Sequence, residues 1–177
     1  MNRLLFALPV AGFIALVGVF GIGLTKDHAA IPSQLIDRPL PAFDLPGLSD
    51  AQPGFGTAEL RGKPLLLNVF ASWCAACPQE HPMLTQIAAS GVPVYGLNWK
   101  DTPPEATRWL GELGNPYRKV ASDPTARTGI DLGVTGVPET FVVDKRGRVR
   151  YKQIGPIDAQ AWETVLKPML AKLEAEA

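Results

Sequence analysis

Cysteine is scarce in this chain, whose 177 residues include only Cys74 and Cys77. A small secreted fold held together by several disulfides needs more cysteines than this, so that class of protein is excluded. The alternatives to a working thiol pair are an inert structural bridge or half of a zinc site, which only His28 and His81 could complete. We therefore expect no bound metal and no cofactor beyond the thiols themselves. The small number of cysteines favours a catalytic role for this pair over a structural one.

An excess of charge of either sign is also absent. The 17 Lys and Arg residues balance 17 Asp and Glu residues. Proteins that bind nucleic acid carry a basic surface, so no nucleic-acid partner is expected. Internal repeats and low-complexity segments are missing as well. The hydrophobic content of 46% is ample for the core of one globular domain.

The N-terminal segment is the longest apolar run, with no charged residue from Leu4 to Leu24. Such a helix can cross a hydrocarbon core about 30 Å thick. A cleaved secretory signal is the alternative, but its apolar centre is usually only about 7–15 residues long. We interpret residues 1–25 as a membrane anchor, residues 26–35 as a tether and residues 36–177 as the folded domain. The flanking charges are nearly even, so they orient the anchor only weakly.

The rest of the chain alternates between strand and helix patterns. Leu65 to Phe70 is apolar apart from Asn68, as expected of a central parallel strand that is covered on both faces. A helical pattern follows at about residues 74–90. The other expected elements are a short edge strand around 42–45, a buried strand at 92–99, a helix from Pro103, a short strand at 117–121, a helical turn at 123–129, a hairpin of 139–144 with 149–154, and a last helix that Asp158 caps and Pro168 kinks.

This order of elements predicts an α/β fold with a mixed central sheet flanked by helices. A Cys-x-x-Cys after the first strand–helix junction is the thioredoxin-like arrangement. Basic residues recur at alternate positions of the hairpin and thus share one face. We expect that face to be solvated, and its members are Arg146, Arg148, Arg150 and Lys152.

The two cysteines stand where the apolar strand gives way to the helical pattern. A helix N-terminus carries partial positive charge and free N–H groups, both of which stabilise a thiolate. Cys74, the first and more exposed of the pair, is therefore expected to be the nucleophile. Cys77 lies nearly one turn further on and is expected to resolve the mixed disulfide that Cys74 forms with a partner.

Glu80 is the acidic residue placed best to serve these thiols. It falls on the inward stripe of the helix together with Cys77, Leu84 and Ile87. Burial raises the pKa of a carboxyl group, so Glu80 could exchange protons with Cys77 as a general base. A solvated helix glutamate is the alternative, because the first turn of a helix is often open to water.

The segment Val137-Pro138-Glu139 precedes an apolar strand. A cis proline there would expose neighbouring backbone for pairing with an extended substrate, although an ordinary strand-initiating proline fits the pattern equally well. Glu139 is either a second acid near the thiols or a surface residue at a strand edge. The pattern alone does not choose between these two interpretations.

Several segments together resemble the cytochrome c biogenesis thiol:disulfide interchange proteins, the CcmG or DsbE family. They are residues 62–82, which include Trp73-Cys-x-x-Cys and Glu-His-Pro, residues 96–101 (Gly-Leu-Asn-Trp-Lys-Asp), residues 114–117 (Gly-Asn-Pro-Tyr) and residues 133–141 (Gly-Val-Thr-Gly-Val-Pro-Glu-Thr-Phe). Trp-Cys-x-x-Cys alone would indicate only the thioredoxin superfamily. The resemblance covers nearly the whole chain, anchor included.

The resemblance implies a protein disulfide reductase anchored in the bacterial inner membrane with its domain in the periplasm. Its substrate would be the disulfide of apocytochrome c, reduced before covalent haem attachment. A membrane electron-donor protein of the DsbD or CcdA type would re-reduce it, among other cytochrome c maturation proteins. Pro138 would be the cis proline, Glu80 and Glu139 the acids of the site, and Trp73 and Val137 would help to shape it.

Two residues depart from related patterns. Position 68 is Asn where ordinary thioredoxins have a buried Asp, and Ala75-Ala76 lacks the proline that many members carry before the second cysteine. Two other functions remain open: a general periplasmic oxidoreductase or isomerase, and a non-catalytic module that holds apocytochrome with the 98–100 loop and the groove by Pro138. A peroxidase is poorly supported, because the chain offers no thiolate pocket besides the pair.

Overall fold

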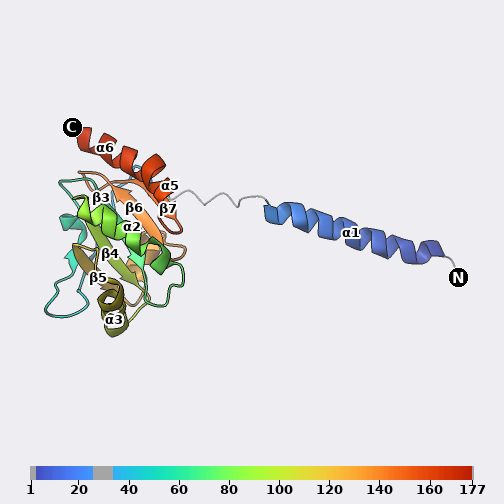
Figure 1. Cartoon of the computed structure of the whole chain (residues 1–177), viewed down its shortest axis with the longest axis horizontal. Helices are drawn as coiled ribbons and strands as arrows, with labels where there is room; N and C mark the ends of the chain where they lie inside the picture. Colours follow the sequence, from blue (N-terminus) through green and yellow to red (C-terminus); the bar gives the residue numbers. More distant parts are fainter. Residues whose placement is uncertain (1–2, 26–33, 177) are drawn as a thin grey trace. The chain divides into compact units, whose positions relative to one another are not determined.

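The computed structural model describes the backbone of residues 3–25 and 34–176, with the side chains of 8–21 and 34–176. Internal contacts divide the chain into two units, Met1–Ile31 and Pro32–Ala177 (Figure 1).

The described part of the first unit is helix α1 (Arg3–Thr25). Among the described residues, no helix has both the length and the apolar character of a membrane span. Residues 26–33, which make up most of the predicted tether, lie outside the described residues.

The second unit is built on a five-stranded sheet with the order β5-β4-β3-β6-β7 (Figure 1). Strand β4 runs parallel to both β3 and β5, whereas β6 runs antiparallel to both β3 and β7. The predicted mixed central sheet is therefore confirmed. Its strands are β3 (Leu65–Phe70), β4 (Val94–Trp99), β5 (Lys119–Asp123), β6 (Glu139–Val143) and β7 (Val149–Ile154).

Two helices connect the parallel strands. The chain steps from β3 to β4 through α2 (Cys77–Ala89) and from β4 to β5 through α3 (Pro103–Leu113). Both steps go in the same direction along the sheet, and right-handed crossovers then place both helices on the same face. The C-terminal α6 (Lys167–Ala175) packs there too. The short α4 (Arg127–Asp131) lies with the core of the other face.

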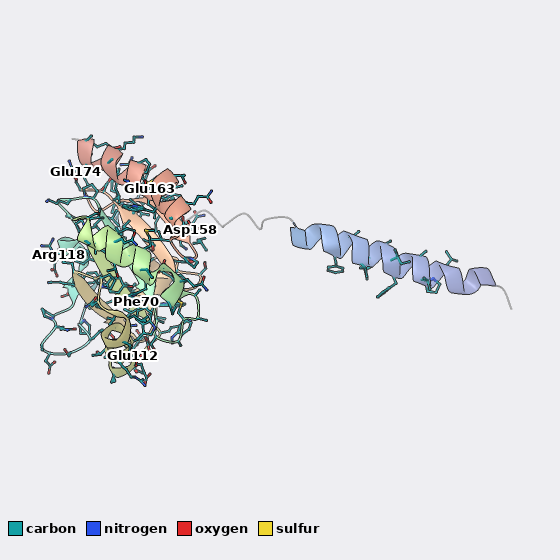
Figure 2. All side chains as sticks on the ribbon, in the orientation of Figure 1. Phe70, Glu112, Arg118, Asp158, Glu163 and Glu174 are labelled. Carbon is teal, nitrogen blue, oxygen red and sulfur yellow. A yellow bond between two sulfur atoms is a disulfide. The ribbon has the colours of Figure 1, made fainter. Side chains whose placement is uncertain are left out.

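The sheet separates two apolar cores. Phe70 and Val142 face the core beneath α2, α3 and α6, whereas Val69 and Phe141 face the other core. All residues of β3, β4 and β6 are buried, as expected of strands covered on both sides. Figure 2 shows Phe70 inside the unit and labelled charged side chains at its periphery: Glu112, Arg118, Asp158, Glu163 and Glu174.

Four predicted elements need correction. The helical turn expected at 123–129 is α4, which begins at Arg127, and Asp123 belongs to β5. The edge strand expected around 42–45 is β1 (Asp44–Leu45), which pairs with β2 (Phe55–Gly56) in a separate small sheet. The helix expected from residue 74 begins at Cys77, so Cys74 precedes it. The last helix is continuous only in part: after Asp158 caps α5 (Ala159–Ala161), residues 162–166 form a π-helical turn. Pro168 explains that turn, because its ring clashes with the carbonyl four residues earlier in a regular helix.

The basic face of the hairpin is not uniformly solvated, contrary to the prediction. Arg146 and Arg148 are exposed. Arg150 contacts the carboxylates of Asp37, Asp144 and Glu176. The side chain of Lys152 is buried. Strand alternation did not place these residues on one face, because Arg146 lies in the turn and the register shift between Val142 and Val143 interrupts the alternation before Lys152, which pairs with Phe141.

The contact between Gly129 and Trp99 gives a steric prediction. A Cβ at Gly129 would overlap the buried indole ring of Trp99. We expect Gly129→Ala to lower the free energy of unfolding by about 2 kcal/mol, as overpacking does. Gly111→Ala is the matched control, because a Cβ at this helical glycine meets no atom within 4 Å and should stabilise by about 0.5–1 kcal/mol. Urea unfolding of both variants measures the difference, and equal effects would contradict the packing argument.

Candidate active site

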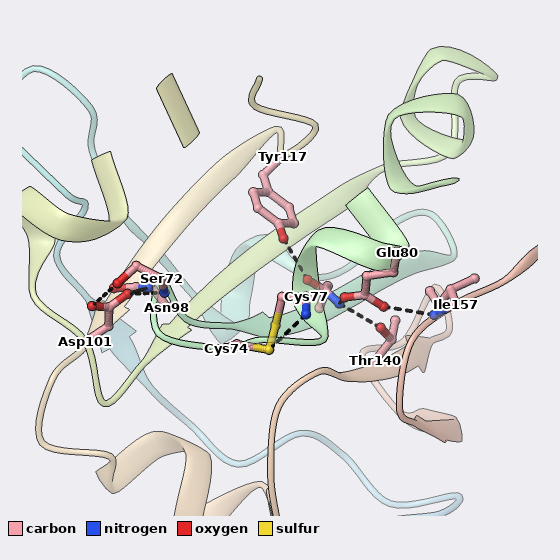
Figure 3. The surroundings of a disulfide bond; sticks show 10 residues. Ser72, Cys74, Cys77, Glu80, Asn98, Asp101, Tyr117, Thr140 and Ile157 are labelled. Atoms are coloured by element: carbon pink, nitrogen blue, oxygen red, sulfur yellow. Dashed lines mark hydrogen bonds between the residues drawn. A yellow bond between two sulfur atoms is a disulfide. The ribbon is translucent and has the colours of Figure 1, made fainter. Parts of the chain in front are cut away.

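The two cysteines are joined in a disulfide at the N-terminus of α2 (Figure 3). Cys74 lies in the loop after β3, and Cys77 is the first residue of the helix. The Cys77 backbone N–H donates a hydrogen bond to Cys74 Sγ at 3.0 Å. Cys74 is 5% exposed and Cys77 is 1% exposed. A helix N–H directed at Cys74 Sγ stabilises a thiolate there, which suits this atom for attack on a partner disulfide.

A buried carboxylate holds the loop that leads into Cys74. Asp101 Oδ2 accepts hydrogen bonds from Ser72 N at 2.6 Å and from Asn98 Nδ2 at 2.8 Å. Its Oδ1 accepts from Ser72 Oγ and from Thr102 N, both at 2.8 Å. Figure 3 shows this group beside the disulfide. Asp101 thereby joins the loops that follow two adjacent parallel strands, β3 and β4.

Trp73 provides the second link between these loops. Its indole Nε1 donates to the carbonyl oxygen of Lys100 at 2.8 Å, while the residue as a whole remains 55% exposed. The ring of Trp99 lies next to it, with centroids 6.5 Å apart, and Lys100 Nζ lies 4.2 Å above the Trp99 ring. Trp73, next to Cys74 in the chain, is therefore exposed where a partner would approach, whereas the Trp99 ring is buried.

Glu80 is buried beneath the disulfide rather than solvated. It is 1% exposed, and each carboxylate oxygen accepts one hydrogen bond: Oε1 from Asn68 Nδ2 at 2.8 Å and Oε2 from Ile157 N at 3.0 Å (Figure 3). Burial raises the pKa of Glu80 from its ordinary value of 4.5 to about 7, while the two hydrogen bonds oppose that rise. A group with this pKa exchanges protons readily at neutral pH.

Asn68 organises the polar groups around Glu80. Its amide nitrogen donates to Thr140 Oγ1 at 2.9 Å as well as to Glu80, and its amide oxygen accepts from the Tyr117 hydroxyl at 2.7 Å. Desolvation raises the pKa of Tyr117 well above its ordinary value, and the charge of Glu80 adds to that rise. The tyrosine therefore stays a neutral donor. Sequence reasoning identified Asn68 only as a departure and assigned no role to Tyr117 or Thr140, since nothing in their spacing relates them to Glu80.

The Val137–Pro138 peptide bond is cis. Pro138 directly precedes β6, which pairs with β3, the strand that leads to the cysteines. Val137 is half-buried and contacts the cores on both sides of the sheet. Val137 and Pro138 therefore stand at the end of the sheet from which the Cys74 loop emerges.

Glu139 is not a surface residue at a strand edge, because β6 is an inner strand and Glu139 is buried. Nor does it lie on the face that carries Glu80. Glu139 is the register partner of Val69, whereas Thr140 is the partner of Asn68. Since neighbouring strand residues point to opposite faces, the Glu139 carboxylate lies on the opposite side of the sheet from α2 and Glu80.

His81 follows Glu80 but takes no part in its hydrogen bonds. Its Nε2 contacts the Gly114 carbonyl oxygen at 2.9 Å, and its ring meets Trp109 edge to face. Burial lowers the pKa of His81. Within residues 34–176, no group of three or more Cys, His, Asp or Glu side chains is arranged to hold a metal ion.

The chain matches known proteins over nearly its whole length. The Redoxin family model matches residues 36–166. Thiol:disulfide interchange protein DsbE of Pseudomonas aeruginosa is 43% identical over 98% of this chain and 96% of its own, and that of Allochromatium vinosum is 46% identical over 94% and 93%. A solved structure from Chlorobium tepidum, assigned as a DsbE protein, is 27% identical with a TM-score of 0.64, covering 82% of this chain and 99% of its own.

These likenesses agree with the geometry of the site. A Cys-x-x-Cys disulfide at the start of a helix, on a thioredoxin-like mixed sheet, is the structure of a thiol:disulfide oxidoreductase. The chain belongs to the Redoxin family and, within it, to the DsbE (CcmG) thiol:disulfide interchange proteins.

Proposed function

We propose that this oxidoreductase reduces the disulfide of apocytochrome c before covalent haem attachment. The observation that carries the proposal is the Cys74–Cys77 pair with a buried carboxyl, Glu80, whose pKa is about 7, three residues into the same helix. The choice of apocytochrome c as substrate rests on the family resemblance of the whole chain. We place the domain in the periplasm, anchored to the inner membrane by residues 1–25.

The reaction begins with the reduced pair. The Cys74 thiolate attacks one sulfur of the substrate disulfide; a bond forms between that sulfur and Cys74 Sγ, and the substrate S–S bond breaks. The second substrate sulfur leaves as a thiolate and takes up a proton. The half-reduced substrate is then held to the protein through Cys74.

Cys77 completes the reduction. Its thiol transfers a proton to the Glu80 carboxylate, and its thiolate attacks Cys74 Sγ. The intermolecular bond breaks, the substrate leaves with both sulfurs reduced, and the Cys74–Cys77 disulfide of the structure forms. Two electrons have passed from the protein to the substrate. A membrane protein of the DsbD or CcdA type would return them by the reverse exchange.

The Val137 backbone is the candidate contact for the substrate. Pro138 has no N–H, and Val137 stands at the end of the sheet beside the emerging Cys74 loop. An extended peptide could form main-chain hydrogen bonds with Val137 there. The exposed ring of Trp73 would contact the residues that flank the substrate cysteines.

Substrate trapping tests the proposal. In Cys77→Ser the second attack is lost, so the full chain should accumulate a mixed disulfide through Cys74 with a peptide that contains oxidised Cys-x-x-Cys-His. Non-reducing electrophoresis and mass spectrometry would identify the adduct, and Cys74→Ser is the control that should form none.

The selectivity of trapping separates the alternatives. Preferential capture of the haem-attachment peptide over an unrelated peptide disulfide would support the cytochrome role. Equal capture of both would point to a general oxidoreductase or isomerase. Absence of any adduct would contradict the proposed reduction.

A further inference from the structure

A buried ion pair lies on the face of the sheet opposite the disulfide. Lys152 Nζ, on β7, is 2.8 Å from Glu139 Oε2, on β6, and the two side chains are 4% and 1% exposed. Lys152 Nζ also lies 5.5 Å above the ring of Phe141. Neither charge takes part in the hydrogen bonds around Glu80 and Asn68, and the reaction described above uses neither of them.

Both charges hold the same loop, residues 133–138, which leads into the cis proline. Lys152 Nζ donates to the Gly133 carbonyl oxygen at 2.8 Å. Glu139 Oε1 accepts from Thr135 N at 3.1 Å and from the Thr135 hydroxyl. The ion pair thus fastens the beginning and the middle of the loop to β6 and β7.

A purely stabilising role does not explain why these positions are charged. The free energy needed to remove a lysine and a glutamate from water offsets most of the attraction between their charges. An apolar pair of similar volume often stabilises a fold as well or better. An apolar pair could not, however, bind the Gly133 carbonyl or the Thr135 N–H. Those backbone contacts are what the charged side chains add, and they set the course of the chain just before Val137.

We propose that Lys152 is a positioning residue for substrate binding. Acting through Glu139 and the Gly133 carbonyl, it holds residues 133–137 in the conformation that pairs with a protein disulfide. Glu139 belongs to the same support and does not serve as an acid or base for the thiols. The inference rests on the proposed binding of substrate at Val137, but not on the identity of that substrate.

The test compares two kinds of disulfide substrate with the full-length chain. For Lys152→Met we expect KM for a peptide disulfide to rise about tenfold while kcat stays within about twofold. The rate with a small aromatic disulfide, which needs no paired loop, should stay within about twofold. Lys152→Arg can donate to both partners and should recover most of the affinity for peptide. Glu139→Gln should likewise change KM more than kcat.

Specific outcomes of these measurements would contradict the proposed roles of Lys152 and Glu139. An unchanged KM in Lys152→Met, an equal loss with the small disulfide, or no recovery in Lys152→Arg would overturn the positioning role. A fall in kcat at unchanged KM in Glu139→Gln would make Glu139 a participant in the chemistry and overturn its assignment.

Two further measurements keep the test independent of folding and of substrate identity. If Lys152→Met does not fold, the double variant Glu139→Leu with Lys152→Met leaves no unpaired buried charge and should show the same rise in KM; a normal KM would refute the inference. Measurements with a haem-attachment peptide and an unrelated peptide disulfide separate the two proposals. A rise in KM for both supports the positioning role even where the cytochrome preference fails.

Discussion

Replacing Asp101 by alanine is expected to lower the free energy of unfolding of the oxidised protein by about 3–4 kcal/mol. Hydrogen bonds to a charged group contribute roughly 1.5–3 kcal/mol each, and Asp101 accepts four of them. Ser72 and Thr102 are partly exposed and can recover water as a partner. The Asn98 amide is buried and cannot, and its oxygen already lacks a hydrogen-bond partner.

Chemical unfolding of the oxidised variant measures this loss. Asp101→Asn should lower the unfolding free energy by less than Asp101→Ala does. The amide oxygen of the asparagine can still accept hydrogen bonds, although its NH₂ group would face the donors that now bind the second carboxylate oxygen. The matched control is Asp131→Ala, which removes an exposed aspartate paired with Arg127 and should change stability by less than about 0.5 kcal/mol. Similar losses at positions 101 and 131 would show that the Asp101 hydrogen bonds do not hold the Cys74 loop.

The unmodified protein is expected to lose about 3 kcal/mol of unfolding free energy between pH 4 and 8 through the ionisation of Glu80, and Glu80→Gln is expected to abolish this loss. The pKa of Glu80 is about 7 in the folded protein and near its ordinary value of 4.5 in the unfolded chain. The folded state therefore binds the proton more tightly. Its stability falls as pH rises from about 4.5 to 7 and stays low above that range, at about 1.4 kcal/mol per pKa unit.

The measurement is the difference between the unfolding free energies of the two proteins from pH 4 to 8, with the disulfide intact so that neither cysteine titrates. His81 acts in the opposite direction, because its pKa is lowered and its protonation destabilises the fold as pH falls. It is present in both proteins and cancels in the difference. Parallel pH curves would mean that Glu80 is already ionised near its ordinary pKa. The amide of the Glu80→Gln variant also places an NH₂ group against a donor, Asn68 Nδ2 or Ile157 N, which shifts the curve of that variant downward at every pH.

Much of the fold follows from hydrophobic patterning. The buried runs 65–70 and 94–99 are strands, and the hairpin around Gly147 forms as its residues predict. The hydrophobic pattern did not predict the features that depend on tertiary contacts alone. The β1–β2 pair consists of two residues per strand, too few to show alternation. The helix after β3 starts three residues late, because Ser72 and Trp73 of the cysteine loop donate hydrogen bonds to Asp101 and Lys100, which are distant in the sequence.

The site was predictable where helical periodicity applies. The inward stripe of α2 placed Glu80 inside, and it is buried. Periodicity gave no comparable guide for Glu139, because all five residues of β6 are buried and neither face shows a polar pattern. Its pairing with Lys152 depends on the hairpin register, which shifts between Val142 and Val143. A local pattern cannot report such a shift.

The unequal access to the two sulfurs restricts how electrons can move through this protein. Cys77 is almost completely enclosed, and only Cys74 reaches the surface, beside an exposed tryptophan. Every electron pair must then enter and leave through the same atom. The proposed electron donor and the proposed substrate would then have to react at the same sulfur, so they would react with Cys74 one after the other. On the proposed function, the rate of turnover would therefore depend on how quickly one partner dissociates before the other binds.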